Sequence, residues 1–114
     1  MGRANVRIVA MTAARELAIP VSHEQVADFC RRWRIRRLSF FGSVVRDDFG
    51  PDSDVDVLVE FRPESHISWN IVTAEQELSE IVGRRVDLRT PPELSRWMIK
   101  DVLREAVIEY VEAD

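Results

Sequence analysis

Two aspartates, Asp54 and Asp56, stand at the start of the apolar segment VDVLVEF, with one residue between them. In a β-strand, residues two apart project from the same face, about 6 to 7 Å from each other along the strand. Two carboxylates on one face form a hard-oxygen site, and Mg²⁺ takes one or two such carboxylates together with waters and substrate phosphate oxygens. We therefore predict that metal ions neutralise the five carboxylates crowded into residues 42–56.

A third acid, Asp87, lies in the short segment RVDLRT, between Val86 and Leu88. A lone charge among apolar neighbours in a strand is costly unless something compensates it. If this strand lies beside the strand that bears the acid pair, three carboxylates converge, and three acids can bridge two metal ions about 3.5 to 4 Å apart. Such metals clamp the entering and leaving oxygens in phosphoryl or nucleotidyl transfer. The alternative is that Asp87 lies on an edge strand and faces water.

The dipeptide Gly42-Ser43 ends the β-prone segment LSFF, twelve positions before Asp54. A glycine lets the backbone approach a phosphate closely, and a serine offers the phosphate a hydroxyl and an amide. Each signal is weak alone, because acidic turns and Gly-Ser steps are common. Their conjunction is far stronger: a strand, Gly-Ser, an acid pair that leads a second strand, and an acid on a third strand.

Periodicity and turn residues place these segments among alternating helices and strands. The sequence predicts helices over about 23–33, 69–82 and 93–104, and strands over 38–41, 55–61 and 85–90. Residues 106–111 either continue the last helix or form a last strand, and residues 12–18 could form a short helix. Helices that alternate with strands predict an α/β or α+β domain, in which helices cover a sheet.

Composition narrows the function classes. With 114 residues, 46% hydrophobic and 32% charged, the chain is expected to form one compact domain. No apolar run approaches the ~18 residues that cross a bilayer, and the N-terminus lacks the apolar stretch of a secretory signal, so we expect a cytoplasmic protein with no membrane partner. A net charge of -4 argues against direct nucleic-acid binding, and the five arginines of residues 31–37 are expected at a solvated helix end.

The single cysteine, Cys30, allows no internal disulfide. The single lysine, Lys100, does not stand in the pattern GxxxxGK, which excludes a Walker-type phosphate site.

Together these residues resemble the DNA polymerase beta nucleotidyltransferase superfamily, whose pattern is a Gly-Ser turn, an acid-x-acid pair and a third acid on a later strand. The resemblance is greatest to its minimal nucleotidyltransferase (MNT) domains, whose motif GSxxRxD is filled by Gly42, Ser43, Arg46 and Asp48. It spans about residues 23–111, and SDVDVLVEF, GRRVDL and LREAV also fit. It implies a small mixed sheet with helices packed on it. In such a site Arg46 would steady either phosphate charge or the loop, and Asp48 would be structural.

The resemblance also implies a reaction, the transfer of AMP from ATP to a hydroxyl group. Asp54 and Asp56 would hold two Mg²⁺ ions, while Asp87 would bind the catalytic ion and help to deprotonate the acceptor. Gly42 and Ser43 would grip the terminal phosphates of the nucleotide.

A partner protein follows from the same resemblance. Small MNT proteins are typically paired with a HEPN-domain ribonuclease toxin and act as its antitoxin by adding AMP to it, often on a tyrosine, so we expect a hetero-oligomer. The chain lacks the toxin's own Arg-x4-6-His motif, because only three residues separate Arg62 from His66. We take residues 1–21 as an N-terminal extension and residues 22–114 as the nucleotidyltransferase domain. Two alternatives stay open: a noncatalytic antitoxin that neutralises by binding alone, and an aminoglycoside-type enzyme, which the lack of room for an acceptor domain disfavours.

Overall fold

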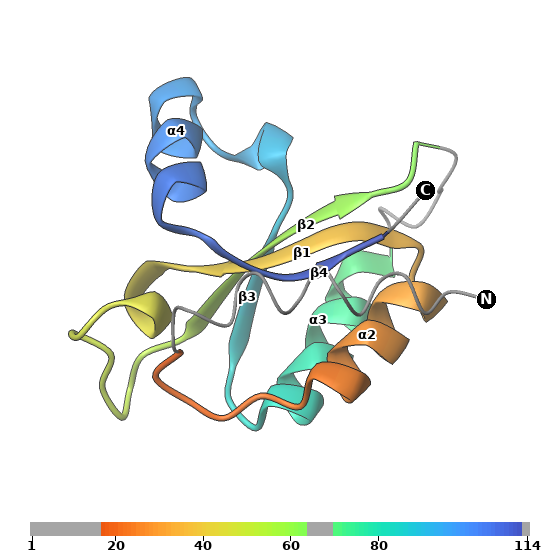
Figure 1. The fold of residues 1–114 in the computed structure, drawn as a ribbon, viewed down its shortest axis with the longest axis horizontal. Helices are drawn as coiled ribbons and strands as arrows, with labels where there is room; N and C mark the ends of the chain where they lie inside the picture. The colour runs from red at the N-terminus through yellow and green to blue at the C-terminus, as the bar shows by residue number, and fades with distance from the viewer. Residues whose placement is uncertain (1–16, 64–69, 113–114) are drawn as a thin grey trace.

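The structure is a computed structural model, and it describes residues 17–63 and 70–112. These residues form a four-stranded mixed sheet and three α-helices (Figure 1). The helices are α2 (His23–Arg32), α3 (Ile71–Val82) and α4 (Arg96–Glu105). The strands are β1 (Ile35–Phe41), β2 (Val55–Phe61), β3 (Val86–Arg89) and β4 (Val107–Val111), in the order β3-β2-β1-β4 across the sheet. The predicted class, helices packed on a small mixed sheet, is confirmed.

Strand pairing brings distant segments to one end of the sheet. β1 and β2 are antiparallel, which places Phe41 opposite Asp56, and β4 pairs antiparallel with the other side of β1. β2 and β3 are parallel, in a register that places Asp56 opposite Asp87. A parallel pair needs a crossover connection, and α3 provides it. The end of β1 therefore meets the first residues of β2 and β3.

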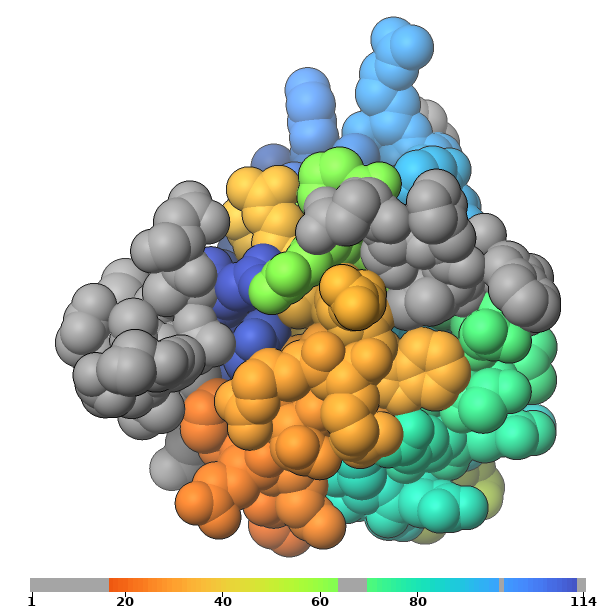
Figure 2. All heavy atoms as spheres, turned by 90° about the vertical axis from the view of Figure 1, so that its right-hand side faces the viewer, coloured from red at the N-terminus to blue at the C-terminus, as the bar shows by residue number. Residues whose placement is uncertain are grey.

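The two faces of the sheet are covered differently. α2 and α3 lie side by side on one face, as Figure 2 shows in orange and green, and they bury the main core against it. That core includes Val26, Phe29, Cys30, Leu78, Val55, Val57 and Val59. α4 covers part of the other face through a second cluster of Phe41, Leu58 and Val102. Since side chains alternate along a strand, Asp54 and Asp56 share the face of Leu58 and α4.

The first strand is longer than predicted. We predicted residues 38–41, but β1 begins at Ile35, which is buried and pairs with Phe61. The carbonyl of Arg36 also accepts a hydrogen bond from the backbone N–H of Glu112, at 2.8 Å. Because β2 and β4 pair with it on both sides, the strand extends through arginines, whose residue type does not predict a strand.

The last helix is shorter than predicted. We predicted residues 93–104, but α4 begins at Arg96, after its N-cap Ser95. Pro91–Glu93 form a separate 3-10 turn, which is closed by a capping box between Thr90 and Glu93. The capping box supplies hydrogen-bond partners within this turn, so the helix begins after the turn and not at the prolines.

Other boundaries follow the prediction more closely. Helix and strand were both open for residues 106–111, of which Val107–Val111 form β4. The helix predicted from residue 69 begins at Ile71. The short helix considered over 12–18 falls almost entirely outside the described residues. Within residues 17–63 and 70–112, no helix has the length and apolar character needed to cross a membrane.

Candidate active site

The three predicted acids lie at one end of the sheet. Asp56 and Asp87 are register partners on β2 and β3, and Asp54 precedes Asp56 by two residues. Asp54 is exposed, whereas the other two are half-buried. Burial raises the pKa of the Asp56 carboxyl, and the charges of Asp87 and Asp54 raise it further, while Arg89 and Arg46 offset part of the effect. The ionised acids therefore repel one another, and a bound cation would relieve this repulsion.

The Gly-Ser turn lies directly beside Asp56. Gly42 follows β1 with φ +75°, in the left-handed region that favours glycine. A Cβ atom at this position would lie only 2.2 Å from Oδ2 of Asp56. Ser43 is half-buried and follows in the 3-10 turn η1 (Gly42–Val45). The missing side chain of Gly42 is thus what lets the Asp56 carboxylate lie against this turn.

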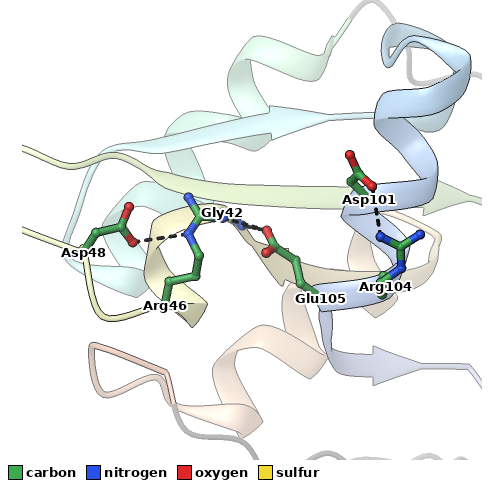
Figure 3. A network of polar contacts seen from close by, with 6 residues as sticks. All are labelled: Gly42, Arg46, Asp48, Asp101, Arg104 and Glu105. Carbon is green, nitrogen blue, oxygen red and sulfur yellow. Dashed lines mark hydrogen bonds and ion pairs between the residues drawn. The ribbon is translucent and has the colours of Figure 1, made fainter.

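Arg46 follows η1 and reaches back across it (Figure 3). Its Nε donates to Oδ1 of Asp48 at 3.2 Å, and its Nη1 donates to Oε1 of Glu105 at 2.9 Å. The hydrogen bond to Asp48 and then that to Glu105 raise the pKa of Arg46. The same Glu105 oxygen accepts the backbone N–H of Gly42 at 3.3 Å. Two donors of the predicted phosphate site, the Gly42 amide and the Arg46 guanidinium, therefore converge on one anionic oxygen.

A cavity of about 560 Å³ opens between this end of the sheet and α4. Such a volume is within the usual range for small-ligand sites, about 300 to 1,000 Å³. Three of the six predicted site residues line it: Gly42, Arg46 and Asp56. The opposite wall belongs to α4, which supplies Met98, Asp101, Val102, Arg104 and Glu105. Sequence reasoning did not predict that α4 forms this wall.

The acids match Mg²⁺ in donor type, because carboxylate oxygens are the ligands that this ion prefers. In this conformation, however, Asp87 is held by Arg89, whose Nε and Nη2 donate to its two oxygens at 3.1 and 3.2 Å. Among the described residues, no group of three or more His, Cys, Asp or Glu side chains is placed so that it could hold a metal ion. The strand register places Asp56 beside Asp87, and in this conformation both oxygens of Asp87 are paired with Arg89.

Arg84 is a residue of this region that the sequence did not single out. Its Nη2 donates to the carbonyls of Gly50, Pro51 and Ser53 at 3.0, 3.1 and 2.9 Å. Its guanidinium also lies over the ring of Phe49, 4.6 Å from the centroid. Arg84 thus fixes the turn that leads into Asp54. Since its partners are backbone carbonyls, no residue pattern could have revealed them.

A second cavity, of about 520 Å³, lies between α2 and α3 on the opposite face of the sheet. It is lined by Glu24, Gln25, Asp28, Arg32, Glu77, Glu80 and Ile81. None of the predicted site residues lines it, so the cavity beside α4 is the candidate active site.

Comparison with known proteins defines the class of this site. The nucleotidyltransferase domain family matches residues 23–110, and the chain belongs to that family. The matched range includes the Gly-Ser turn and the three acids.

Within this class the chain is homologous to the protein adenylyltransferase MntA of Thermococcus cleftensis, with 35% identity over 100 residues, 87% of this chain and 98% of the relative. A solved minimal nucleotidyltransferase is 33% identical, with a TM-score of 0.64 over 75% of this chain and 86% of its own. A toxin-antitoxin crystal structure with AMP-PNP shares the fold, with a TM-score of 0.65 and 16% identity over 80% of this chain and 74% of its own.

Proposed function

We propose that this protein is a Mg²⁺-dependent protein adenylyltransferase that transfers AMP from ATP to a hydroxyl of a partner toxin. The observation that carries the proposal is the meeting of the Gly42 turn with Asp56, which is in register with Asp87. This arrangement brings a turn suited to phosphate and the Asp56 carboxylate to one cavity, with Asp87 next to Asp56 on the neighbouring strand. The family membership and the homology with MntA support AMP transfer as the reaction.

In the proposed reaction Asp54, Asp56 and Asp87 would hold two Mg²⁺ ions, and these ions would supply stabilisation of negative charge on the triphosphate and the leaving group. The acceptor oxygen attacks the α-phosphorus of ATP, an oxygen–phosphorus bond forms, and the bond to the β-phosphate bridging oxygen breaks to release pyrophosphate. Asp87 takes the proton of the acceptor hydroxyl. For this step Asp87 would have to exchange its ion pair with Arg89, whose side chain is 45% exposed, for the acceptor hydroxyl.

The phosphate side of the site consists of the Gly42 amide, the Ser43 hydroxyl and the Arg46 guanidinium. The proposed role of Gly42 and Ser43 is to hold the terminal phosphates, with Arg46 adding positive charge. Asp48 keeps Arg46 at the turn through their ion pair, at 3.2 Å. These donors and the acids lie on the same side of the sheet, so the triphosphate would bridge them.

The proposed partner is a HEPN-domain ribonuclease toxin, modified on a tyrosine within a cytoplasmic hetero-oligomer. Two comparisons support a toxin as the acceptor: MntA is a protein adenylyltransferase, and the structure with AMP-PNP is a toxin-antitoxin complex. In this assignment the present chain is the antitoxin. Attachment of AMP would silence the toxin without continued binding.

The test is to incubate the protein with the product of its neighbouring gene, ATP and Mg²⁺, and to measure the intact mass of that partner. We expect a gain of one or more AMP units, lost in the double variant Asp54→Asn with Asp56→Asn. The matched control is Asp47→Asn with Asp52→Asn, which removes two exposed carboxylates of the same acidic segment and should keep activity. An unmodified partner in a stable complex would favour the noncatalytic antitoxin, and AMP transfer to an aminoglycoside instead of the partner would favour the small-molecule enzyme.

A further inference from the structure

Glu105, the last residue of α4, reaches the phosphate side of the candidate site from a distant part of the chain. Its Oε1 accepts the Gly42 N–H at 3.3 Å and Nη1 of Arg46 at 2.9 Å, and the side chain is about one-third exposed. Figure 3 shows its carboxylate pointing toward Gly42 and Arg46. Glu105 therefore occupies the position where the two donors converge.

A single anionic oxygen that accepts from a backbone amide and a guanidinium is held as a phosphate oxygen would be. The two donors cannot serve Glu105 and a phosphate oxygen at the same position. A carboxylate that stayed there would also repel the phosphate, because like charges a few ångströms apart destabilise each other. A phosphate oxygen that bound at this position would therefore displace the carboxylate.

We propose that Glu105 is an internal competitor for the phosphates of the nucleotide, and that it sets the affinity of the site for ATP. This inference rests on the proposed function, because it takes Gly42 and Arg46 as phosphate ligands. The carboxylate keeps Arg46 paired while no nucleotide is bound. When a phosphate displaces it, Glu105 is released toward the cavity wall of α4.

The neighbouring charges on α4 do not share this role. Asp101 also lines the cavity, but its Oδ1 pairs with Nη1 of Arg104 at 3.1 Å, one turn along the same helix. Asp101 has no contact with Gly42 or Arg46 among its hydrogen bonds. It therefore offers a matched control, an acid on the same helix and in the same cavity that does not occupy the anion position.

The experiment is calorimetric titration of ATP with Mg²⁺ into the wild type, Glu105→Gln, Glu105→Ala and Asp101→Asn at 0.15 M salt. Ion pairs at the protein surface contribute little, so removal of Glu105 should tighten the Kd for ATP by only roughly three- to fivefold. Glu105→Gln keeps the shape of the side chain and should tighten binding less than Glu105→Ala. Asp101→Asn should change the Kd by less than about twofold, because screened charges outside direct contact contribute little.

The outcomes separate the two levels of the proposal. Tighter binding in the Glu105 variants, lost when Arg46 is also changed to Ala, supports competition at the shared donors. Unchanged or weaker ATP binding in both variants, with an unchanged melting temperature, overturns it and makes Glu105 a group that merely orients Arg46. Equal tightening by Asp101→Asn also overturns it in favour of a general charge effect. If neither the wild type nor any variant binds ATP, the nucleotide site itself is wrong.

Discussion

Replacement of Gly42 by alanine tests the contact on which the site depends. The new Cβ would lie 2.2 Å from Oδ2, 3.1 Å from Cγ and 3.3 Å from Cβ of Asp56. Cβ atoms in proteins essentially never come within 3.0 Å of another atom, so the Asp56 carboxylate has to move by roughly 1 Å. A displacement of that size in a catalytic constellation costs about 100-fold in rate, so AMP transfer should fall by about that factor.

The stability of Gly42→Ala should fall much less than its activity. The φ of +75° costs a non-glycine residue about 1 to 2 kcal/mol, while the Asp56 carboxylate, the end of a side chain, can swing away. Gly83→Ala is the matched control, because Gly83 has φ +81° and no atom lies within 4 Å of its would-be Cβ. Both variants should lose about 1 to 2 kcal/mol in urea unfolding.

Only the variant at Gly42 should lose AMP transfer in a single-turnover assay read by partner mass. Full AMP transfer by both alanine variants would refute the reasoning, because the clash with Asp56, which only Gly42→Ala introduces, would then have no effect. Equal loss in both would point to backbone strain and not to displacement of the acid.

Three further predictions concern Asp56, Arg84 and Cys30. The pKa of Asp56 is raised in the folded protein, so its contribution to stability is present below the unfolded pKa and is lost as the pH rises through the folded pKa. At neutral pH without metal, Asp56→Asn should therefore raise the free energy of unfolding measured in urea, and this gain should shrink toward about pH 4. A gain that does not depend on pH would contradict this explanation. Arg84→Ala removes the donor that the carbonyls of Gly50, Pro51 and Ser53 share, and it should cost about 0.5 to 1.5 kcal/mol, because these carbonyls can be hydrated in its place. Amide hydrogen exchange in that turn should become faster. Unchanged exchange would show that the turn keeps its shape without Arg84. Burial raises the pKa of the Cys30 thiol, so a disulfide reagent should modify it at pH 8 only as fast as the protein unfolds. Rapid modification of the native protein would show that the thiol is not packed in the core.

The sequence predicted those features of the site that depend on residues close together in the chain. Alternation along β2 fixes the shared face of Asp54 and Asp56, and a glycine after a strand marks a turn with special backbone geometry. The sequence could not say that Asp87 would lie directly opposite Asp56, because parallel register depends on how the crossover helix packs. The individual roles of these residues in catalysis stay predictions.

The remaining differences have a common physical origin. Glu105 meets Gly42 across 63 positions of sequence, so the contact depends on where α4 lies over the sheet. The extra residues of β1, from Ile35 onward, also depend on neighbours, because β2 and β4 pair with them. Tertiary pairing determined both features, whereas the predictions used only local patterns.

The outer edge of β3 carries a further consequence for how a partner protein can approach. The backbone N–H of Leu88 donates to Oε2 of Glu75 at 2.8 Å, and that of Val86 donates to Oγ of Ser79 at 3.0 Å. Both acceptors belong to α3, so side chains occupy the donors that an exposed sheet edge would offer to another strand. A protein that tried to extend the sheet beside Asp87 would first have to break both bonds. If the proposed function holds, the segment that carries the acceptor hydroxyl should therefore approach the acids over a face of the sheet and not by strand addition at this edge.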